Sequence, residues 1–178
     1  VLALGEGGVW IRNSGNLVLG NTGSTTSVLS TGAVNISTTG SMEVKSSVLG
    51  RGTVVLSTVD AATAGQDMTI DSGVVIFAAG SAVNSTTGVA TGGIVALGAG
   101  DNFTMAEGST ISAATGVLIQ GDAGDADPGT GSTIDISGQI VSPTIVVFGN
   151  GDHDTINLRN ATQGTYLLDG RGSGDTYQ

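Results

Sequence analysis

The sequence contains no cysteine, so neither disulfides nor a zinc site built on thiolates can stabilise its fold. Charged residues make up only 11% of its 178 residues and aromatic residues only 3%, whereas an ordinary domain has about 25% charged residues. No run of about 20 apolar residues occurs, and therefore no membrane-spanning helix is expected. Five Lys and Arg stand against fifteen Asp and Glu, which gives a net charge of −10. Such a surface repels nucleic acid and anionic membranes.

Glycine is abundant, with 31 residues, and the mean hydropathy is positive at +0.27. The apolar residues are mostly Val, Ile, Leu and Ala, and β-branched side chains favour strands. No apolar period of 3.6 residues persists over about 12 residues, so helices are not expected. Residues 1–100 have five acids and three bases, whereas residues 101–178 have ten acids and two bases. A cation is therefore the expected partner of the C-terminal part.

The chain contains an internal repeat. Residues 27–38 match residues 47–58 at seven of twelve positions, at an offset of 20 residues. A β-sandwich would not place near-identical segments at a constant offset, whereas stacked coils do. Six apolar triplets continue the pattern, and they lie at residues 54–56, 74–76, 94–96, 117–119, 145–147 and 166–168. The longer intervals between them contain both prolines, Pro128 and Pro143, as loop insertions do.

These repeats predict an all-β fold, a parallel β-solenoid (β-helix) with coils of about 20–23 residues. We expect the six triplets to form one parallel sheet in register, with Val75 beside Val95 on the next strand. Residues 1–178 are expected to be a single solenoid segment of a longer protein, because the chain begins at Val1 without an initiator methionine and stops within a repeat. Residues 121–131 are predicted to be a loop insertion.

Gly-rich turns between the strands also repeat, in the form Gly-x-Gly-x-x-x-Thr followed by an apolar residue. The copies begin at Gly98, Gly149 and Gly170. Asp152 and Asp154 lie in the second copy, and Asp175 lies one coil further on, in register with Asp154. Carboxylate and carbonyl oxygens are the ligands of hard cations, so these turns predict a Ca²⁺ site. Asp and Gly are also ordinary turn residues, which is the alternative interpretation.

A second candidate for Ca²⁺ is the acidic loop that contains Asp122, Asp125 and Asp127. It is not an EF-hand loop, because Thr133 occupies the position of the bidentate Glu.

The turns at residues 149–156 and 170–177 resemble the nonapeptide calcium repeats of RTX proteins, although both copies have one extra residue before the final Asp. The resemblance implies calcium-binding coils over residues 145–178. In that family the ligands are backbone carbonyls of the Gly-rich turn and the Asp side chain. The implied ligands here are Gly149, Gly151, Asp154, Gly170, Gly172 and Asp175.

The remaining sequence is similar to the β-helical shafts of large bacterial surface proteins of the filamentous-haemagglutinin and autotransporter-adhesin kind. This similarity implies an extracellular or cell-surface structural segment, adhesin-like or filament-forming, and not an enzyme. A polysaccharide lyase or hydrolase is the alternative, with Asp152 and Asp154 as a formal acid–base pair. An ice-binding solenoid is another alternative, for which Thr58, Thr69, Thr104, Thr155 and Thr176 form an irregular rank.

Alternation along the triplet strands predicts an apolar outer face as well as an apolar interior. A bare face of this kind exceeds what a monomer usually exposes. We therefore expect it to pack against another copy or another segment of the parent protein, unless loop 121–131 covers it. The predicted interface residues are Val55, Val75, Phe77, Val95, Leu97, Leu118, Val146 and Phe148.

Overall fold

The structure is a computed structural model that describes residues 3–20, 25–80, 92–160, 163–172 and 174–178. These residues form nineteen strands and no helix, and hence none that could cross a membrane. The strands are β1 (Ala3–Gly5), β2 (Gly8–Asn13), β3 (Leu17–Leu19), β4 (Thr26–Ser30), β5 (Ala33–Thr38), β6 (Met42–Val44), β7 (Ser47–Gly50), β8 (Val54–Thr58), β9 (Met68–Ile70), β10 (Val75–Ala78), β11 (Ile94–Gly98), β12 (Phe103–Met105), β13 (Thr110–Ala113), β14 (Gly116–Gln120), β15 (Thr133–Ile136), β16 (Gln139–Phe148), β17 (Thr155–Leu158), β18 (Gln163–Asp169) and β19 (Thr176–Tyr177).

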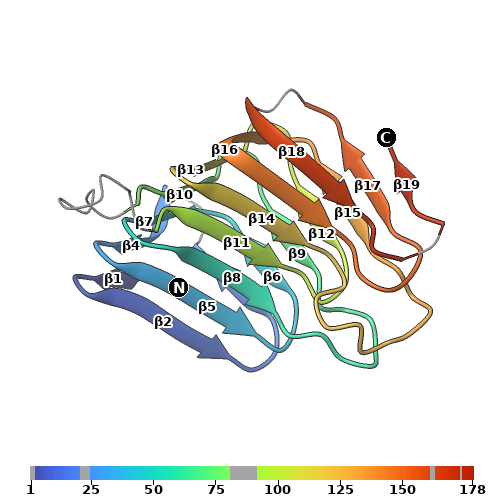
Figure 1. Ribbon diagram of the computed structural model, residues 1–178. Coiled ribbons are helices and arrows are strands. Elements are labelled where there is room, and N and C mark those ends of the chain that lie inside the picture. The colour runs from blue at the N-terminus through green and yellow to red at the C-terminus, as the bar shows by residue number, and fades with distance from the viewer. Residues whose placement is uncertain (1–2, 21–24, 81–91, 161–162, 173) are drawn as a thin grey trace.

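Every strand pairs in parallel with the strand three elements away, apart from the step around β16, and this arrangement is a parallel β-solenoid. The coils rise from the blue N-terminal strands to the red C-terminal strands in Figure 1. Each coil has three walls. The first wall contains β2, β5, β8, β11, β14, the C-terminal half of β16 and β18; the second contains β3, β6, β9, β12, β15, β17 and β19; the third contains β1, β4, β7, β10, β13 and the N-terminal half of β16.

The strand register confirms the solenoid and the 20-residue repeat. Val34 pairs with Val54, 20 residues further along, and Ile145 pairs with Tyr166, 21 residues further along. Two steps are longer. Val117 pairs with Ile145 because the loop after β14 is inserted between them. Val54 pairs with Val95 across a coil that also contains β9 and β10.

The prediction that all six triplets share one sheet register is wrong for residues 74–76. Val75 and Ile76 belong to β10, which pairs with β7 and β13 in the third wall, so Val75 does not neighbour Val95. The reason is that strands of every wall have the same alternation of apolar residues. The 20-residue steps from 54 to 74 and from 74 to 94 therefore connect different walls of the same coil.

The core lies inside the three walls and consists of ranks of stacked apolar side chains. One rank from each wall is listed here: Val34, Val54, Val95, Val117 and Ile145; Met42, Met68, Phe103 and Ile134; and Val48, Ile76, Ile111 and Ile140, all fully or almost fully buried. Burial of each such side chain stabilises the fold by about 1.5–3 kcal/mol. The core holds the ends of successive strands of the first wall in line, and this alignment positions the loops that follow them.

Strand β16 passes from the third wall to the first. Its first residues pair with β13 and its last residues with β14, and its register against β18 shifts between Val141 and Thr144. Pro143 lies within this irregular stretch and not in a loop insertion as the sequence had suggested. A proline has no backbone N–H to donate, so an irregular position in a strand accommodates it.

Candidate metal centre and apolar face

Five aspartates from three different coils meet beyond the C-terminal end of the first wall. We call this group the acidic corner, and it consists of Asp60, Asp122, Asp125, Asp127 and Asp152. Asp60 follows β8, the next three follow β14, and Asp152 follows β16. Because β8, β11, β14 and β16 are successive strands of one wall, their C-terminal ends lie along one edge. Residues that are far apart in sequence are thereby brought together.

The loop after β14 folds back across the preceding coil to reach Asp60. The Ala123 N–H donates to the Ala99 carbonyl at 2.8 Å, and the Asp122 N–H donates to the Asp101 carbonyl at 3.0 Å. The Ala126 N–H donates to Asp60 Oδ2. Gly124, at φ +149, passes so close that a Cβ there would lie 2.8 Å from the Asp60 Cβ. The loop is thus fixed against Asp60 by both backbone hydrogen bonds and close contact.

The carboxylates of the acidic corner are close enough to share cations. One oxygen each from Asp60, Asp122 and Asp127 lie within 4.8 Å of one another, and the same holds for Asp122, Asp125 and Asp152. Calcium takes oxygen ligands at 2.3–2.6 Å, so two oxygens bound to one ion are at most about 5 Å apart. Both groups therefore have the spacing of a Ca²⁺ site.

Asp122 is the most deeply buried member, with 1% of its surface exposed. Neither of its carboxylate oxygens has a hydrogen-bond partner among the described residues, and the same is true of Asp60 Oδ1. A buried carboxylate without a partner is strongly unfavourable unless it is neutralised by a proton or a cation. Asp122 is therefore an unsatisfied group in the middle of a cluster of like charge.

The electrostatics of the corner agree with this. Burial raises the pKa of Asp122 from its ordinary 3.8 to about 7, and the carboxylates of Asp125, Asp60, Asp154 and Asp127 raise it further in the same direction. The pKa of Asp127 is also raised, first by desolvation and then by Asp101 and Asp60. Both shifts show that adding negative charge here is costly and that adding positive charge is favourable.

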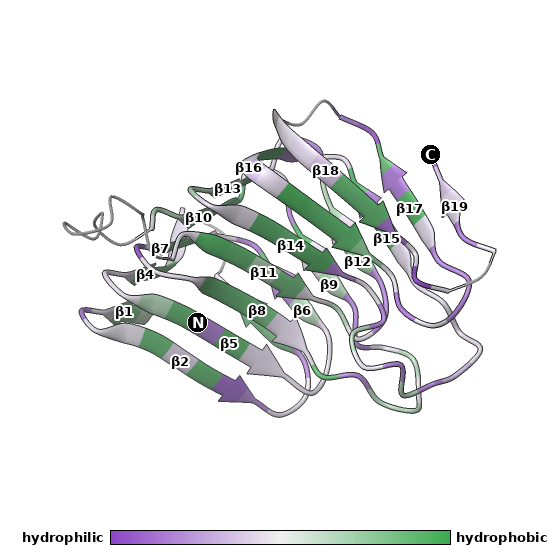
Figure 2. Ribbon diagram, viewed as in Figure 1, coloured by the Kyte–Doolittle hydropathy of each residue, from purple (hydrophilic) through white to green (hydrophobic). Residues whose placement is uncertain are grey.

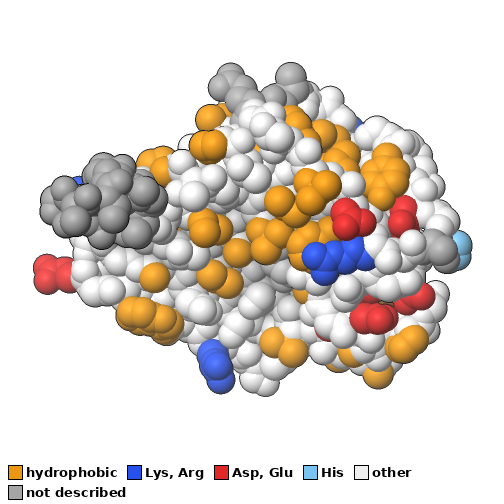
Figure 3. All heavy atoms as spheres, viewed as in Figure 1, with side chains coloured by type: hydrophobic (Ala, Val, Ile, Leu, Met, Phe, Trp, Pro, Cys, Tyr) orange, Lys and Arg blue, Asp and Glu red, His pale blue; other side chains and the backbone are white. Residues whose placement is uncertain are grey.

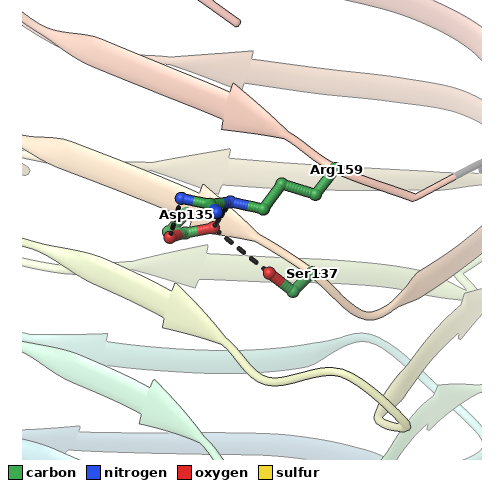
Figure 4. Close-up of polar contacts among 3 residues, drawn as sticks. All are labelled: Asp135, Ser137 and Arg159. Atoms are coloured by element: carbon green, nitrogen blue, oxygen red, sulfur yellow. Dashed lines mark hydrogen bonds and ion pairs between the residues drawn. The ribbon is translucent and has the colours of Figure 1, made fainter.

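Elsewhere, an acid at a wall surface is neutralised by the chain itself. On the second wall, Arg159 Nε and Nη2 donate to the two oxygens of Asp135 at 3.1 and 3.0 Å, and the Ser137 hydroxyl donates to the same carboxylate at 3.3 Å (Figure 4). Lys45 likewise pairs with Glu43 and Asp71. Among the described residues, no salt bridge joins a Lys or Arg to the acidic corner.

The aspartates implied by the RTX resemblance have a different environment. Asp154 is buried and its carboxylate accepts three hydrogen bonds: from the Ser132 N–H and hydroxyl at 2.7 Å each, and from the Asn150 N–H at 3.0 Å. Asp175 accepts from the Asp154 N–H at 3.0 Å, which confirms the predicted register of these two residues. Both side chains therefore cap backbone N–H groups of neighbouring coil turns.

The glycines of these turns make room for the caps and for coil stacking. A Cβ on Gly149 would overlap the Asp154 carboxylate, and one on Gly170 would overlap the Asp175 carboxylate. A Cβ on Gly172 would overlap the Asp152 carbonyl oxygen of the coil beneath it. Gly151 approaches the Asp125 carboxylate and so borders the acidic corner. The Gly-x-Gly repeat therefore has a structural explanation that does not require a metal.

Sequence reasoning missed Asp60 and misaligned Asp101. Phe103, Ile134 and Ile156 share one rank, so Asp101 corresponds to Asp154 and not to Asp152. Asp101 Oδ2 indeed accepts the N–H groups of Gly65 and Gln66, at 2.5 and 2.6 Å, as the other caps do. No local motif marks Asp60. The only signal for it is its position two residues after a first-wall strand.

The first wall has an apolar outer face, although its composition differs from the prediction. Pairing places one outward-pointing residue per strand in a single column: Trp10, Asn35, Val55, Ala96, Leu118, Val146 and Leu167. Six of these seven are apolar. Figure 2 shows the hydrophobic stretches of β8, β11, β14 and β16 side by side, and Figure 3 shows hydrophobic side chains gathered over the middle of this face, with acidic side chains beyond the ends of the strands. We call it the apolar column.

Val55, Leu118 and Val146 belong to the apolar column as expected. Val95 and Leu97 do not: both are buried in the core, because β11 pairs one residue out of the register assumed for its triplet. A shift of one residue moves every side chain of a strand to the opposite face. Ile94 and Ala96 point outward in their place.

The remaining three predicted interface residues are placed differently. Val75 and Phe77 are exposed, but on the third wall, where Phe77 continues a column with Leu4, Leu29 and Leu49. Phe148 points outward on the first wall but is only 7% exposed. The guanidinium of Arg171 lies 3.7 Å from the centroid of its ring and covers it.

A hollow of about 490 Å³ lies where the apolar column meets the acidic corner. Val55, Ala96 and Leu118 form its floor, and the loop residues Ala123 and Ala126 border it. Loop 121–131 therefore flanks the apolar column at one end, and Leu167, at the last strand of the column, is 57% exposed.

No family model, curated protein or solved structure matches this chain. Its class is therefore defined by its own architecture: two all-parallel sheets with the hydrogen-bonding pattern of a β-solenoid.

Proposed function

We propose that this chain is a non-enzymatic structural segment of an exported bacterial surface protein, adhesin-like or filament-forming, and that Ca²⁺ bound at the acidic corner stabilises it. The observation that carries the calcium proposal is Asp122, buried among four other aspartates with both carboxylate oxygens unpartnered. Oxygen-only ligands with high negative charge suit a hard divalent cation.

Calcium at this position would act as a link between coils. Asp60 belongs to the coil of β8, Asp122 to the coil of β14 and Asp152 to the turn after β16. Without a cation these carboxylates repel one another, whereas a bound ion converts the repulsion into attraction. A ligand at 100 times its Kd adds about 2.7 kcal/mol to the free energy of unfolding.

The distribution of basic side chains favours a structural role over cleavage of anionic polysaccharides. Lys45 and Arg159 are engaged in salt bridges on the second wall, and Arg171 covers Phe148 on the first. They lie on different walls and do not converge on the acidic corner. Threonine pairs on the second wall are also short: the outward column there is Val18, Glu43, Thr69, Thr104, Asp135 and Asn157, which gives little support to ice binding.

Thermal unfolding with Ca²⁺ and with a chelator tests the calcium proposal. We expect Ca²⁺ to raise the Tm of the wild type and Asp122→Asn to remove most of this increase. Glu107→Gln, an exposed acid outside the corner, is the control for loss of charge and should leave the increase intact. Asp154→Ala should lower the Tm equally with and without Ca²⁺, because it removes a backbone cap. Equal melts of the wild type in both buffers would contradict the proposal.

The apolar column supports a second part of the proposal, lateral packing against another copy of this chain. The first wall is about 17 Å wide, for five-residue strands, and about 30 Å long, for seven strands. Two such faces would bury about 1,000 Å² in total, the lower limit for a specific interface. A two-fold axis parallel to the strands, passing through β11, would place Trp10 of one copy opposite Leu167 of the other.

Charge agrees with this arrangement. The outward column next to the apolar column begins with Arg12 on β2 and ends with Asp169 on β18. The same two-fold axis brings these opposite charges together twice. Sedimentation of Val55→Ser with Leu118→Ser should show a shift toward monomer, whereas Leu29→Ser with Phe77→Ser, on the third wall, should not. A wild type that is monomeric at high concentration would contradict lateral packing.

A further inference from the structure

Asp122 is common to both groups of carboxylates in the acidic corner. One group pairs it with Asp60 and Asp127, and the other with Asp125 and Asp152. Both of its oxygens lack a hydrogen-bond partner in the described part of the chain, so each is available to a different ligand. A carboxylate whose two oxygens are both free can bind two cations at once, one on each oxygen.

We propose that the acidic corner binds two Ca²⁺ ions and that the carboxylate of Asp122 bridges them. Asp60 and Asp127 complete the carboxylate ligands of the first ion, and Asp125 and Asp152 those of the second. This inference rests on the proposed calcium function, to which it adds the number of ions and the ligands of each.

Each group contains one carboxylate that the backbone holds in place while an oxygen stays free for an ion. The Ala126 N–H donates to Asp60 Oδ2, and Asp60 Oδ1 is buried without a partner. The Gly129 N–H donates to Asp152 Oδ2 at 2.7 Å, which leaves Oδ1. The two groups are therefore built alike, with one anchored carboxylate, one carboxylate from the loop after β14 and a share of Asp122.

Charge balance also favours two ions. Five carboxylates within one corner carry a charge of −5 when ionised, and a single divalent cation would leave most of this charge uncompensated. Two divalent cations offset four of the five charges, and the buried Asp122 then has a positive charge beside each oxygen. Backbone carbonyls and water can supply the remaining oxygens that calcium requires.

Direct counting of bound Ca²⁺ by equilibrium dialysis tests this inference. The wild type and Glu107→Gln should each bind two ions per chain, Asp127→Asn and Asp125→Asn one ion each, and Asp122→Asn neither ion at the same free concentration. A wild type that binds one ion, or an Asp125→Asn, Asp127→Asn double variant that still binds one, would overturn the bridged pair while leaving the calcium function standing. A wild type that binds none would overturn the calcium function itself. Circular dichroism verifies that each variant is folded.

A spectroscopic measurement distinguishes two adjacent ions from two distant ones. Lanthanides replace Ca²⁺ at oxygen sites, and luminescence energy passes from Tb³⁺ to a second lanthanide only over short distances. The wild type loaded with a mixture of Tb³⁺ and Eu³⁺ should show this transfer. Asp125→Asn and Asp127→Asn should each lose it while retaining one bound ion, and its absence in the wild type would overturn the bridged arrangement.

Discussion

At the scale of single residues, the loop after β14 depends on unusual backbone conformations. Asp122 and Asp125 adopt φ values of 46° and 52°, in the left-handed region. Asp and Asn enter this region several-fold more often than other non-glycine residues. Their short side chains can therefore tolerate the turns that direct the loop toward Asp60 and the turn after β16. Replacement of either by a β-branched residue would strain the backbone as well as remove a carboxylate.

The raised pKa of Asp122 predicts how the stability of the metal-free protein depends on pH. The unfolded chain loses this proton near pH 3.8, whereas the folded chain retains it to about pH 7. Between these values the folded state binds more protons, so its free energy of unfolding falls as pH rises, by up to about 1.4 kcal/mol per pH unit for one group. Asp127, whose pKa is shifted in the same direction, adds to this trend.

Denaturant unfolding in chelator between pH 4 and pH 7 measures this fall. In Asp122→Asn the decrease should be smaller, because the neutral amide has no proton to lose. A wild type whose metal-free stability rises with pH over this range would contradict the assigned environment of Asp122.

Gly124 predicts a steric test of the corner. An alanine there would bring its Cβ to 2.8 Å from the Asp60 Cβ, so the loop and Asp60 must separate. We expect Gly124→Ala to weaken Ca²⁺ binding by roughly tenfold, or about 1.4 kcal/mol. Gly129→Ala is the matched control, because Gly129 also has a positive φ but open space around it. Equal calcium affinities in titrations of the two variants would show that contact with Asp60 is unimportant.

At the scale of elements, the register of β11 decides which residues belong to the core. Val95 is buried and Ala96 points outward, the reverse of the faces that the triplet pattern predicted. Val95→Ser should therefore lower the free energy of unfolding by about 2–4 kcal/mol, because it removes buried methyl groups and buries a hydroxyl. Ala96→Ser should change it by less than about 0.5 kcal/mol. Chemical denaturation of the two variants measures the difference, and equal losses would contradict this register.

The sequence was sufficient to predict the solenoid, but not the wall to which each strand belongs. Residues 27–38 and 47–58 are aligned correctly because both copies span the same two walls without an insertion. The triplet at 74–76 was misplaced because its alternation is the same in every wall. The acidic loop at 122–127 was recognised from composition, whereas Asp60 became visible only when coil stacking placed it beside that loop.

At the scale of the whole molecule, lateral packing predicts a charge exchange. Arg12→Asp should weaken self-association, because it would place an acid opposite Asp169 of the other copy. Asp169→Arg alone should weaken it in the same way, and the double variant Arg12→Asp, Asp169→Arg should restore it, since the opposite charges face each other again. Sedimentation equilibrium at low salt measures all four proteins. A double variant no better than the single ones would contradict the two-fold arrangement.

The path of the loop after β14 has a mechanical consequence. It crosses the coil of β11 to reach Asp60, so ions held at the acidic corner would tie together turns of the chain that are not neighbours along the solenoid axis. The segment enclosed between Asp60 and Asp152 is about 90 residues long, and cross-links that enclose long segments restrict the unfolded chain most strongly. Under a pulling force, the coils within this segment could not peel away one at a time until the ions were released. Calcium would then set the force at which a surface shaft built from such coils begins to extend.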